Sequence, residues 1–440
     1  MIRPDRPRRT ELGLIVIVAI IVGSTYTLAS LGRTASIPGN IVPFVVIIVA
    51  LLVAAHIALR MLAPRADPVL LALAGLLNGV GYVFIARLNR RLAAAQATWT
   101  LLGIVAFIAT LLVVRRIRDL QRYQWTLALV GIGALVLPLV PKIGRSINGS
   151  RLWVRVGPLS FQPGEFSKVC FAAFFAGYLI SKRELLATPT WKVGPLHLPE
   201  PRHLGPILFA WGGSILVMTA ETDLGSSLLL FTLFLVMIWL ATERPWYLVT
   251  GFVMFAASAY VAWRNFAHVQ KRVTTWLHPW RDPTGASFQI VQASFAFAWG
   301  GIAGAGPGLG DPGRIPAAET DFIFAVIGEE LGLLGAATVL VAYLLMVGIG
   351  LRIAIRCDRQ FDKLLAAGLT TIIGVQAFVI IGGVIRLIPL TGLTLPFLSF
   401  GGSSLIANYI LLALLLRISD DTARRQEDRL GVPDGDLVAA

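Results

Sequence analysis

Four acidic residues surround the start of an apolar segment, in the stretch Ile315-Pro-Ala-Ala-Glu-Thr-Asp-Phe-Ile-Phe-Ala-Val-Ile-Gly-Glu-Glu-Leu-Gly332. Glu319 and Asp321 come just before a predicted helix, where Thr320 or Asp321 is suited to cap the helix N-terminus. Glu329 and Glu330 follow a few turns later in the same segment. A carboxylate near hydrocarbon needs a partner or a chemical task. The segment is therefore a candidate functional site.

A second group of charged residues lies in Gly149-Ser-Arg-Leu-Trp-Val-Arg-Val-Gly-Pro-Leu-Ser-Phe-Gln-Pro-Gly-Glu-Phe-Ser-Lys168. Glu165 and Lys168 are three residues apart at the start of a predicted helix, so they share one face and can pair. One interpretation is a structural ion pair that lowers the cost of burying both charges. The other is that Lys168, Arg151 and Arg155 draw an anionic substrate into a cavity. The spacing alone favours neither interpretation.

Other polar motifs carry less information. A helix cap explains Glu221 and Asp223 almost as well as a binding site does. The run Gly300–Gly310 could bring backbone N–H groups to a diphosphate, but it lacks the strand and the Lys-Ser/Thr of a P-loop and is more typical of a flexible loop. The five histidines have no ligand-like spacing. Cys170 and Cys357 belong to no CxxC or zinc pattern, so we expect no disulfide and no metal cluster.

The composition indicates that membrane helices hold these residues. Of 440 residues, 56% are hydrophobic and only 14% are charged, which a lipid environment accepts and a soluble core does not. The net charge of +14 comes from basic residues between apolar runs, so topology and anionic headgroups explain it better than nucleic acid does. We expect an all-α polytopic membrane helix bundle of about twelve transmembrane helices. The predicted spans are Leu12–Leu31, Ile41–Leu62, Val69–Ala86, Thr98–Val114, Tyr123–Val140, Gly164–Ile180, Leu204–Ala220, Leu224–Thr242, Pro245–Trp263, Leu331–Ile353, Leu364–Ile385 and Leu398–Leu416.

The basic residues predict the orientation of these spans. Most of them fall on one side, and the positive-inside rule places that side, with both termini, in the cytoplasm. The exceptions are Arg87, Arg90 and Arg91, which fall outside. On this topology three stretches that we expect to be non-helical face outward, namely Lys142–Pro163, Asn265–Thr320 and Arg386–Phe400. Loops held by a rigid bundle commonly carry function, so we expect the site there.

Five sequence blocks occur in an order typical of one family. They are Gln162-Pro-Gly-Glu-Phe-Ser-Lys168, Thr222-Asp-Leu-Gly225, Arg272–Gly310 with Leu277-His-Pro-Trp-Arg-Asp-Pro-Thr-Gly285 and Gln289/Gln292, Thr320–Gly332, and Pro389-Leu-Thr-Gly-Leu-Thr-Leu-Pro-Phe-Leu-Ser-Phe-Gly-Gly-Ser-Ser404. Together they resemble the SEDS family of bacterial wall growth, which comprises the RodA, FtsW and sporulation proteins. The resemblance covers Gly149–Leu416.

The resemblance implies a peptidoglycan glycosyltransferase that polymerises lipid II into glycan strands, releases undecaprenyl diphosphate and serves cell elongation and shape. Lipid II has an α-linked diphosphate and the product is β-linked, so one inverting displacement suffices. That step needs a base on one face and stabilisation of the departing diphosphate on the other. By position, Asp321 is the family's essential acidic residue, and its implied role is general base on the 4-hydroxyl of the acceptor sugar.

The resemblance implies further site residues. The candidates for stabilising the diphosphate are Arg151, Lys168, Lys271 and Arg272. Glu165 would orient Lys168, and Glu330 would brace the helix behind Asp321. The remaining substrate-binding candidates in the matching blocks are Gln289, Gln292, Ser403 and Ser404.

The resemblance also bears on cofactors and partners. No metal ligand set is visible in the sequence, although the diphosphate could itself recruit a divalent cation such as Mg²⁺ or Mn²⁺. The substrates implied are lipid II and the nascent glycan strand. The expected protein partner is a single-span class B penicillin-binding protein, which would supply transpeptidation.

The chain departs from the family pattern mainly at its N-terminus. The family core usually has three spans before the Arg-Trp block, whereas five are predicted here, so residues 1–141 would include two extra spans. Residues 142–418 would form the catalytic core with its external loops, and residues 419–440 a disordered cytoplasmic tail. Smaller departures lose hydroxyl groups but no charge, and they are Gly164, Phe288, Ala293 and Phe400.

Three alternatives compete with this interpretation. A lipid II flippase would also suit intramembrane charge, but it predicts matched broken helices in two halves and features at both faces. A non-catalytic scaffold would not need Asp321 at the mouth of a cationic cavity. A division-type polymerase is the third, although Ile315-Pro-Ala-Ala-Glu319 and the extended N-terminus are more similar to the elongation branch in actinobacteria.

Overall fold

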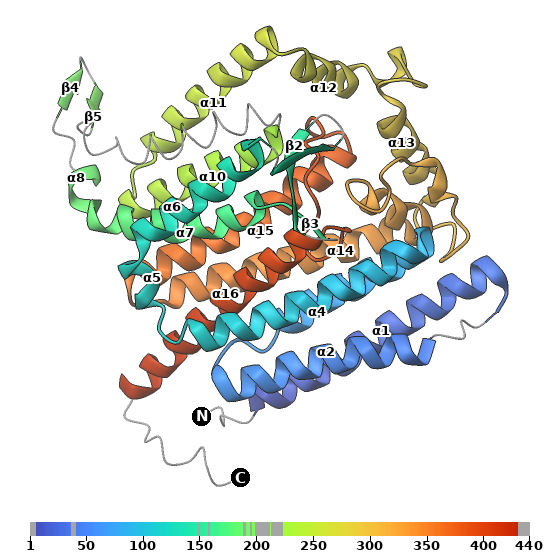
Figure 1. Ribbon diagram of the computed structural model, residues 1–440, viewed down its shortest axis with the longest axis horizontal. Coiled ribbons are helices and arrows are strands. Elements are labelled where there is room, and N and C mark those ends of the chain that lie inside the picture. Colours follow the sequence, from blue (N-terminus) through green and yellow to red (C-terminus); the bar gives the residue numbers. More distant parts are fainter. Residues whose placement is uncertain are drawn as a thin grey trace. The chain divides into compact units, whose positions relative to one another are not determined.

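The computed structural model describes residues 6–36, 41–141, 143–147, 150–156, 159–187, 191–193, 196–198, 212 and 223–429 (Figure 1). Within these residues, nine helices are long and apolar enough to cross a membrane. The predicted all-α polytopic membrane bundle is confirmed. Every predicted span coincides with a helix except Leu204–Ala220, which lies outside the described residues.

The chain forms two compact units. Unit 1 consists of Met1–Ile117, Gln292–Asp358 and Thr394–Ala440, and unit 2 consists of Arg118–Val291 and Arg359–Leu393. The long helices of unit 1 are α1 (Arg6–Thr34), α2 (Ile41–Leu62), α3 (Leu70–Leu88), α4 (Arg90–Val113), α14 (Ile323–Arg356) and α16 (Gly402–Arg429). Since unit 1 takes its helices from both ends of the chain, residues far apart in the sequence meet inside it.

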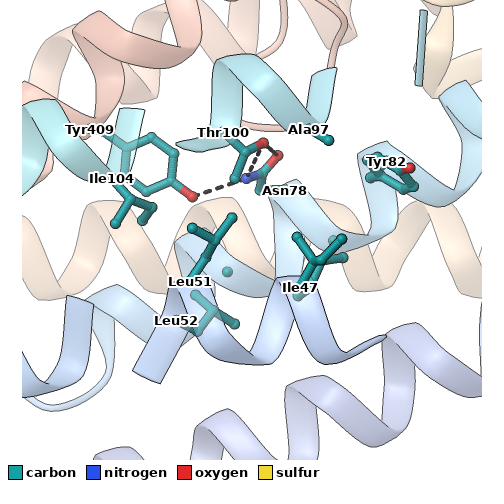
Figure 2. A pocket seen from close by; sticks show the side chains of 12 residues that line it. Ile47, Leu51, Leu52, Asn78, Tyr82, Ala97, Thr100, Ile104 and Tyr409 are labelled. Atoms are coloured by element: carbon teal, nitrogen blue, oxygen red, sulfur yellow. Dashed lines mark hydrogen bonds between the residues drawn. The ribbon is translucent and has the colours of Figure 1, made fainter. Parts of the chain in front are cut away.

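The core of unit 1 lies where α16 packs against α4, and where α1 and α14 pack against α3. Tyr409 of α16 is fully buried, and its hydroxyl accepts a hydrogen bond from Asn78 Nδ2 of α3 at 2.9 Å. A small residue permits this packing, because a Cβ atom at Gly103 of α4 would lie 2.5 Å from the Tyr409 ring. Figure 2 shows the pocket beside these residues, where Thr100 joins Asn78 and Tyr409 among mostly aliphatic side chains of α2, α3 and α4.

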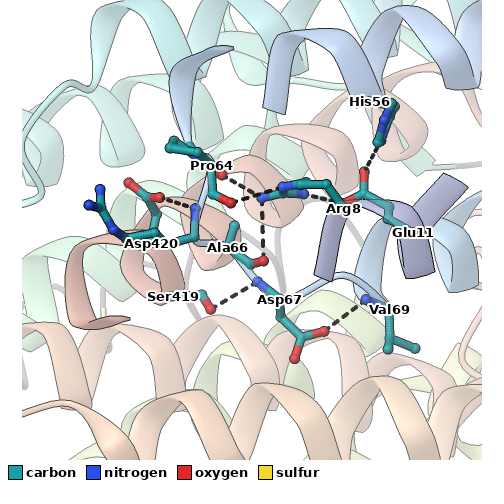
Figure 3. A network of polar contacts seen from close by, with 11 residues as sticks. Arg8, Glu11, His56, Pro64, Ala66, Asp67, Val69, Ser419 and Asp420 are labelled. Atoms are coloured by element: carbon teal, nitrogen blue, oxygen red, sulfur yellow. Dashed lines mark hydrogen bonds and ion pairs between the residues drawn. The ribbon is translucent and has the colours of Figure 1, made fainter. Parts of the chain in front are cut away.

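The loop between α2 and α3 connects the two ends of the described chain (Figure 3). Arg8 of α1 donates through Nε to the Pro64 carbonyl at 3.0 Å, and it forms an ion pair with Glu11. Glu11 also contacts Nδ1 of His56 on α2 at 2.9 Å. On the other side of the loop, the backbone N–H of Arg65 donates to Asp420 Oδ1 of α16 at 2.7 Å.

These loop contacts correct the prediction of a disordered tail. Helix α16 continues to Arg429, so residues 419–429 are helical. Asp420 is buried in the contact with Arg65. The side chain of Arg65 forms an ion pair with Glu427, which lies about two turns further along α16. The polar composition of this segment concealed the tertiary contacts that hold it. Residues 430–440, the rest of the predicted tail, lie outside the described residues.

Unit 2 is built around an aromatic core. Its helices are α5 (Arg118–Arg122), α6 (Gln124–Val136), α7 (Gly164–Ser181), α8 (Arg183–Ala187), α10 (Leu224–Thr242), α11 (Trp246–Asn265), α12 (Ala267–Leu277) and α15 (Gln360–Val384). Helix α7 packs against α6, α10 and α15. The Phe174 ring of α7 lies 5.5 Å from the Trp125 ring of α6, and Phe175 lies 5.6 Å from Phe234 of α10. Such aromatic contacts anchor α7, whose first residues include two of the predicted site residues, Glu165 and Lys168.

The three stretches predicted to be non-helical differ from one another. The first contains an antiparallel sheet of order β1-β2-β3, formed by β1 (Gly144–Ile147), β2 (Ser150–Val156) and β3 (Leu159–Phe161). A short β-hairpin of β4 (Trp191–Val193) and β5 (Leu196–Leu198) follows α8. The third stretch, before α16, is irregular as predicted.

The prediction for the second stretch, Asn265–Thr320, is wrong. It contains α12, α13 (Phe288–Gly300) and the short 3₁₀ helices Pro279–Arg281 and Pro312–Arg314. In α12 the apolar residues Val269, Val273 and Trp276 recur at helical spacing, which is typical of an amphipathic helix. The many glycines and prolines of the stretch hid this pattern, because they lie between the two helices and after them.

Candidate functional site

Asp321 lies immediately before α14 in unit 1, and its side chain is half-buried. The N-cap position of α14 is held by Phe322, so neither Thr320 nor Asp321 occupies the cap position that we predicted for one of them. From Phe322 to Glu330 every residue is buried. The helix that follows Asp321 is therefore anchored in the interior of unit 1.

Two of the five family blocks, Thr320–Gly332 and Pro389–Ser404, which we call the two signature segments, meet through hydrogen bonds on both sides of Thr320. The Ser399 hydroxyl donates to the Thr320 carbonyl at 2.6 Å, and the Phe400 N–H donates to the Glu319 carbonyl at 2.8 Å. Ser399 is buried, and its Oγ also accepts from the N–H of Leu395 at 3.0 Å. These bonds fix the backbone that leads directly into Asp321.

Glu330 has partners on both carboxylate oxygens, whereas Glu329 has a partner on one of them. Glu330 is fully buried; its Oε1 lies 2.9 Å from Arg87 Nε, and its Oε2 accepts from the Gly308 N–H at 2.7 Å. Glu329 Oε1 accepts from the Asp311 N–H at 2.8 Å, while its Oε2 is buried without a hydrogen-bond partner among the described residues. Both carboxylates therefore hold the loop that precedes Asp321.

Arg87 is one of the three basic residues that depart from the positive-inside pattern, and its contacts explain its own departure. Besides Glu330, its Nη2 donates to the Gly310 carbonyl at 2.7 Å and to the Gly308 carbonyl at 3.2 Å. Its side chain is only 12% exposed. An arginine that neutralises a buried carboxylate does not determine topology by its charge, so counting it with the loop cations was misleading.

The glycine-rich run is an ordered support for a broken helix. Helix α14 is interrupted at Gly332, whose φ of 67° and ψ of −165° are non-helical. The interruption frees the carbonyls of Glu329 and Glu330, which accept from the N–H groups of Ala305 and Gly306 at 2.9 and 3.0 Å. The N–H groups of Leu333 and Leu334 donate in return to the carbonyls of Gly301 and Ile302 at 2.9 and 3.2 Å.

These backbone bonds determine which N–H groups of the run Gly300–Gly310 are available to a ligand. Buried backbone polar groups need partners, and the loop supplies them to α14 at the point where the helix cannot. Glycine is required at Gly304, where φ is +88° and a Cβ atom would lie 2.3 Å from the Glu330 carbonyl oxygen. The N–H groups that we considered for a diphosphate are thus occupied at Gly304, Gly306 and Gly308.

The start of α7 in unit 2 holds the predicted Glu165–Lys168 pair. Lys168 Nζ lies 2.7 Å from Glu165 Oε1, and the two side chains are 2% and 5% exposed. The pairing is therefore confirmed. Whether Lys168 also meets a substrate stays a prediction, because an ion pair and a substrate-orienting pair have the same resting geometry.

The sheet of unit 2 gathers cations on one face. Arg151, Trp153 and Arg155 alternate along β2, so their side chains lie on the same face. Arg145 of β1 is directly opposite Trp153, which adds a third arginine to that face. All three arginines are exposed. Arg145 was not among the predicted site residues. The i, i+2 alternation of Arg151, Trp153 and Arg155 and the short connection between β1 and β2 could have revealed it.

Helix α12 places its two cations differently. Lys271 is exposed, whereas Arg272 Nη1 donates to the carbonyls of Leu390 and Thr391 at 3.0 and 2.8 Å. One turn on, Trp276 Nε1 donates to the Arg386 carbonyl at 3.0 Å. Arg272 therefore fixes the loop after α15, within unit 2.

The remaining candidates are polar residues at helix starts or on helix faces. Asp223 Oδ1 accepts from the Ser226 N–H at 3.0 Å and caps α10, while Glu221 and Thr222 lie outside the described residues. The half-buried Gln289 and Gln292 share a face of α13. Ser403 and Ser404 are buried in the first turn of α16, where Ser404 Oγ accepts from Asn408 Nδ2 at 3.3 Å.

The cysteines and the acidic and histidine side chains are the groups that could form disulfides or metal sites. Both cysteines are free thiols. Across the described part of the chain, no three His, Cys, Asp or Glu side chains cluster in a way that could hold a metal ion. The candidate residues thus comprise one half-buried acidic residue on a fixed segment of unit 1 and, within unit 2, a separate set of paired or exposed cations.

The fold and these motifs define a multi-pass membrane protein with polar segments between its helices. Residues 69–424 match the sequence model of the FtsW/RodA/SpoVE family of cell cycle proteins. The chain belongs to this family. The match begins after α2, so α1 and α2 lie outside it. That residues 1–141 include two additional spans stays a prediction.

Curated relatives agree with this assignment. The peptidoglycan glycosyltransferase RodA of Mycobacterium tuberculosis is 44% identical over 95% of this chain and 91% of its own length. The protein of the same name from Mycobacterium leprae is 42% identical over 94% and 90%. A probable peptidoglycan glycosyltransferase FtsW from Geobacter metallireducens is 34% identical over 74% and 84%.

Solved structures show the same fold. The rod shape determining protein RodA of Thermus thermophilus matches with a TM-score of 0.57 and 26% identity, over 81% of this chain and 97% of that one. A chain of a peptidoglycan synthase complex that coordinates polymerization and crosslinking matches with a TM-score of 0.57 and 28% identity, over 86% and 97%. This chain is accordingly a multi-pass bacterial membrane protein.

Proposed function

We propose that this chain is a peptidoglycan glycosyltransferase that polymerises lipid II by an inverting displacement and releases undecaprenyl diphosphate. One observation carries the proposal: the two signature segments are hydrogen-bonded to each other at Thr320, beside the half-buried Asp321. The names of the mycobacterial relatives support the same activity and favour a role in cell elongation and shape. A division role is the alternative within this activity.

Asp321 acts as the general base. In the ionised form its carboxylate takes the proton from the acceptor 4-hydroxyl as that oxygen attacks the anomeric carbon of lipid II, and the carbon–diphosphate bond breaks on the opposite face. Such a base must be placed accurately, because misplacement by about 1 Å can cost on the order of 100-fold in rate. The bonds from Ser399 and Phe400 supply that positioning.

The cations of unit 2 have distinct proposed roles toward the leaving diphosphate. The exposed Lys271 and the arginine face of β1 and β2, formed by Arg145, Arg151 and Arg155, bind its negative charge. Lys168 is a buried cation whose orientation Glu165 fixes. Arg272 contributes by holding the loop after α15. Gln289, Gln292, Ser403 and Ser404 complete the proposed substrate contacts.

The proposed orientation puts Asp321 on the outer face of the cytoplasmic membrane and both termini in the cytoplasm. The positive-inside pattern of the other basic residues supports it, and one of its three exceptions, Arg87, is explained by its ion pair. The class B penicillin-binding protein is the proposed partner, and the resemblance to a chain of a peptidoglycan synthase complex supports a partner of that kind. Any divalent cation would arrive with the diphosphate.

Fluorescent lipid II polymerisation tests the proposal. Wild type and Asp321→Asn are purified, with and without the candidate transpeptidase, and the products are resolved as glycan ladders. We expect a ladder from wild type and at least a 100-fold weaker one from Asp321→Asn, because a base contributes about 10²–10⁴-fold. Asp311→Asn is the matched control, since Asp311 is an exposed carboxylate in the preceding loop that pairs only with the exposed Arg314 in the described structure.

Two results would contradict the proposal. A ladder of full strength from Asp321→Asn would remove the assigned base. Absence of a ladder with every partner and cation, together with movement of lipid II across proteoliposome membranes, would favour the transporter. The break at Gly332 in α14 is the feature that suits transport, but no second broken span occurs among the described helices.

A further inference from the structure

The C-terminal end of α1 packs directly against the glycine-rich run of unit 1. A Cβ atom at Gly32 would lie 2.2 Å from the Pro307 carbonyl oxygen, and one at Gly308 would lie 2.1 Å from the Ala29 carbonyl oxygen. Such distances are far below any normal carbon–oxygen contact. The two backbones therefore touch, and only glycine at both positions allows it.

A hydrogen bond extends this contact to α3. Arg33, the next residue of α1, donates through Nη1 to the Arg87 carbonyl at 3.0 Å. The Arg87 side chain in turn binds Glu330 and the carbonyls of Gly308 and Gly310. The end of α1 thus meets both the loop and the arginine that clamp Glu330.

The clamped residue belongs to a short, rigid half of α14. Residues 322–330 are all buried, and the half-helix is limited by Asp321 at one end and by the break at Gly332 at the other. Ser399 and Phe400 fix the Asp321 end. The end of the half-helix near Gly332 is fixed by the loop 301–310, by Arg87 and by α1.

We propose that α1, which lies outside the residues matched to the family, is a positioning element for Asp321. It supports the Pro307–Gly308 loop, which holds Glu330 and the broken end of the half-helix, so that the other end presents Asp321 in a fixed place. Gly32, Arg33 and Arg87 are positioning residues in this sense. The inference rests on the proposed function, in which Asp321 is the base.

A pair of substitutions on one helix tests the inference in the full-length protein. Gly32→Val inserts a branched side chain against Pro307, whereas Gly13→Val is the matched control because nothing lies within 4 Å of a Cβ atom at Gly13. We expect Gly32→Val to lower kcat for lipid II polymerisation by on the order of 10- to 100-fold with little change in KM. Gly13→Val should polymerise as wild type does.

Hydrogen exchange distinguishes loss of this support from a general loss of stability, because the first should raise exchange at the loop amides alone and the second throughout the bundle. The amides of Ala305, Gly306, Leu333 and Leu334, which bond the loop to the helix break, should exchange faster in Gly32→Val and be unchanged in Gly13→Val. Arg33→Ala covers the case in which Gly32→Val does not fold. It should raise the same exchange rates more weakly, and Arg33→Lys should restore them in part.

The outcomes separate the inference from the function on which it rests. If Asp321→Asn abolishes the glycan ladder while Gly32→Val and Arg33→Ala keep wild-type kcat, the positioning role is wrong and the proposed base stands. If Asp321→Asn polymerises as wild type does, both are overturned. Reduced kcat with unchanged exchange of the loop amides would also overturn the inference, because α1 would then act by another route.

Discussion

The hydroxyl of Ser399 donates to the carbonyl oxygen of Thr320 over 2.6 Å, and this bond ties one signature segment to the residue that precedes Asp321 in the other. The same Oγ accepts from the Leu395 N–H, so a single side chain stabilises both its own loop and the neighbouring one. The two segments, almost 80 residues apart in the sequence, are one structural element.

Ser399→Ala should separate the two segments without removing a charge. It leaves the Thr320 carbonyl and the Leu395 N–H without their partner, at a cost of about 1–3 kcal/mol in unfolding free energy. We expect a lower melting temperature and weaker glycan ladders. Ser24→Ala, which removes an exposed hydrogen bond within α1, is the control and should change neither. Wild-type polymerisation by Ser399→Ala would show that the bond does not position Asp321.

Substitution of the Glu165–Lys168 pair distinguishes its two interpretations. Glu165→Gln or Lys168→Met alone leaves one buried charge unpaired and should destabilise the protein by about 3–5 kcal/mol. The double variant removes both charges and should recover much of that stability. If the pair is purely structural, the double variant should recover polymerisation activity together with stability. Since we propose that Lys168 acts on the diphosphate, we expect a stable double variant that polymerises poorly.

Arg87→Gln should destabilise the protein far more than the same change at a neighbouring arginine does. It leaves Glu330 buried without its counter-charge, at a cost of about 3–5 kcal/mol. Arg90→Gln is the matched control, because Arg90 is exposed at the start of α4. Thermal unfolding in detergent and expression level in membranes provide the measurements. Equal stability of the two variants would show that Glu330 does not depend on Arg87.

Replacement by alanine of two glycines in α14 should change the stability of the protein in opposite directions. Gly332→Ala forces a side chain into a conformation with φ of 67° and within 2.3 Å of the Gly304 nitrogen, so it should destabilise the protein and reduce polymerisation. Gly348→Ala adds a Cβ atom in open space within a regular helix, where alanine is favoured over glycine by about 0.5–1 kcal/mol. It should be neutral or slightly stabilising in the same unfolding assay.

The sequence was informative wherever one local pattern dominates. Runs of apolar residues located the long helices because a span must be both long and apolar. The three-residue spacing of Glu165 and Lys168 located their ion pair for a similar reason. Both depend on neighbours in the chain, which a linear pattern records.

Other features could not be predicted because they depend on distant partners. Helix α16 extends past residue 419 because Arg65, more than 350 residues earlier, binds Asp420 and Glu427. Arg87 looked like a topological signal because nothing near it in the sequence shows that Glu330 neutralises it. The order of the run 301–310 depends on a helix break that no sequence pattern marked beyond the glycine itself.

The loop between α2 and α3, which meets Arg8 on one side and Asp420 on the other, has a consequence for how the protein is made. Unit 1 draws on segments far apart in the sequence, so during synthesis it cannot form complete until α16 has been made. Arg65 meets its partners on α16 only after more than 350 further residues have been added. A nascent chain that stops before residue 420 therefore lacks this contact between α16 and the loop that follows α2.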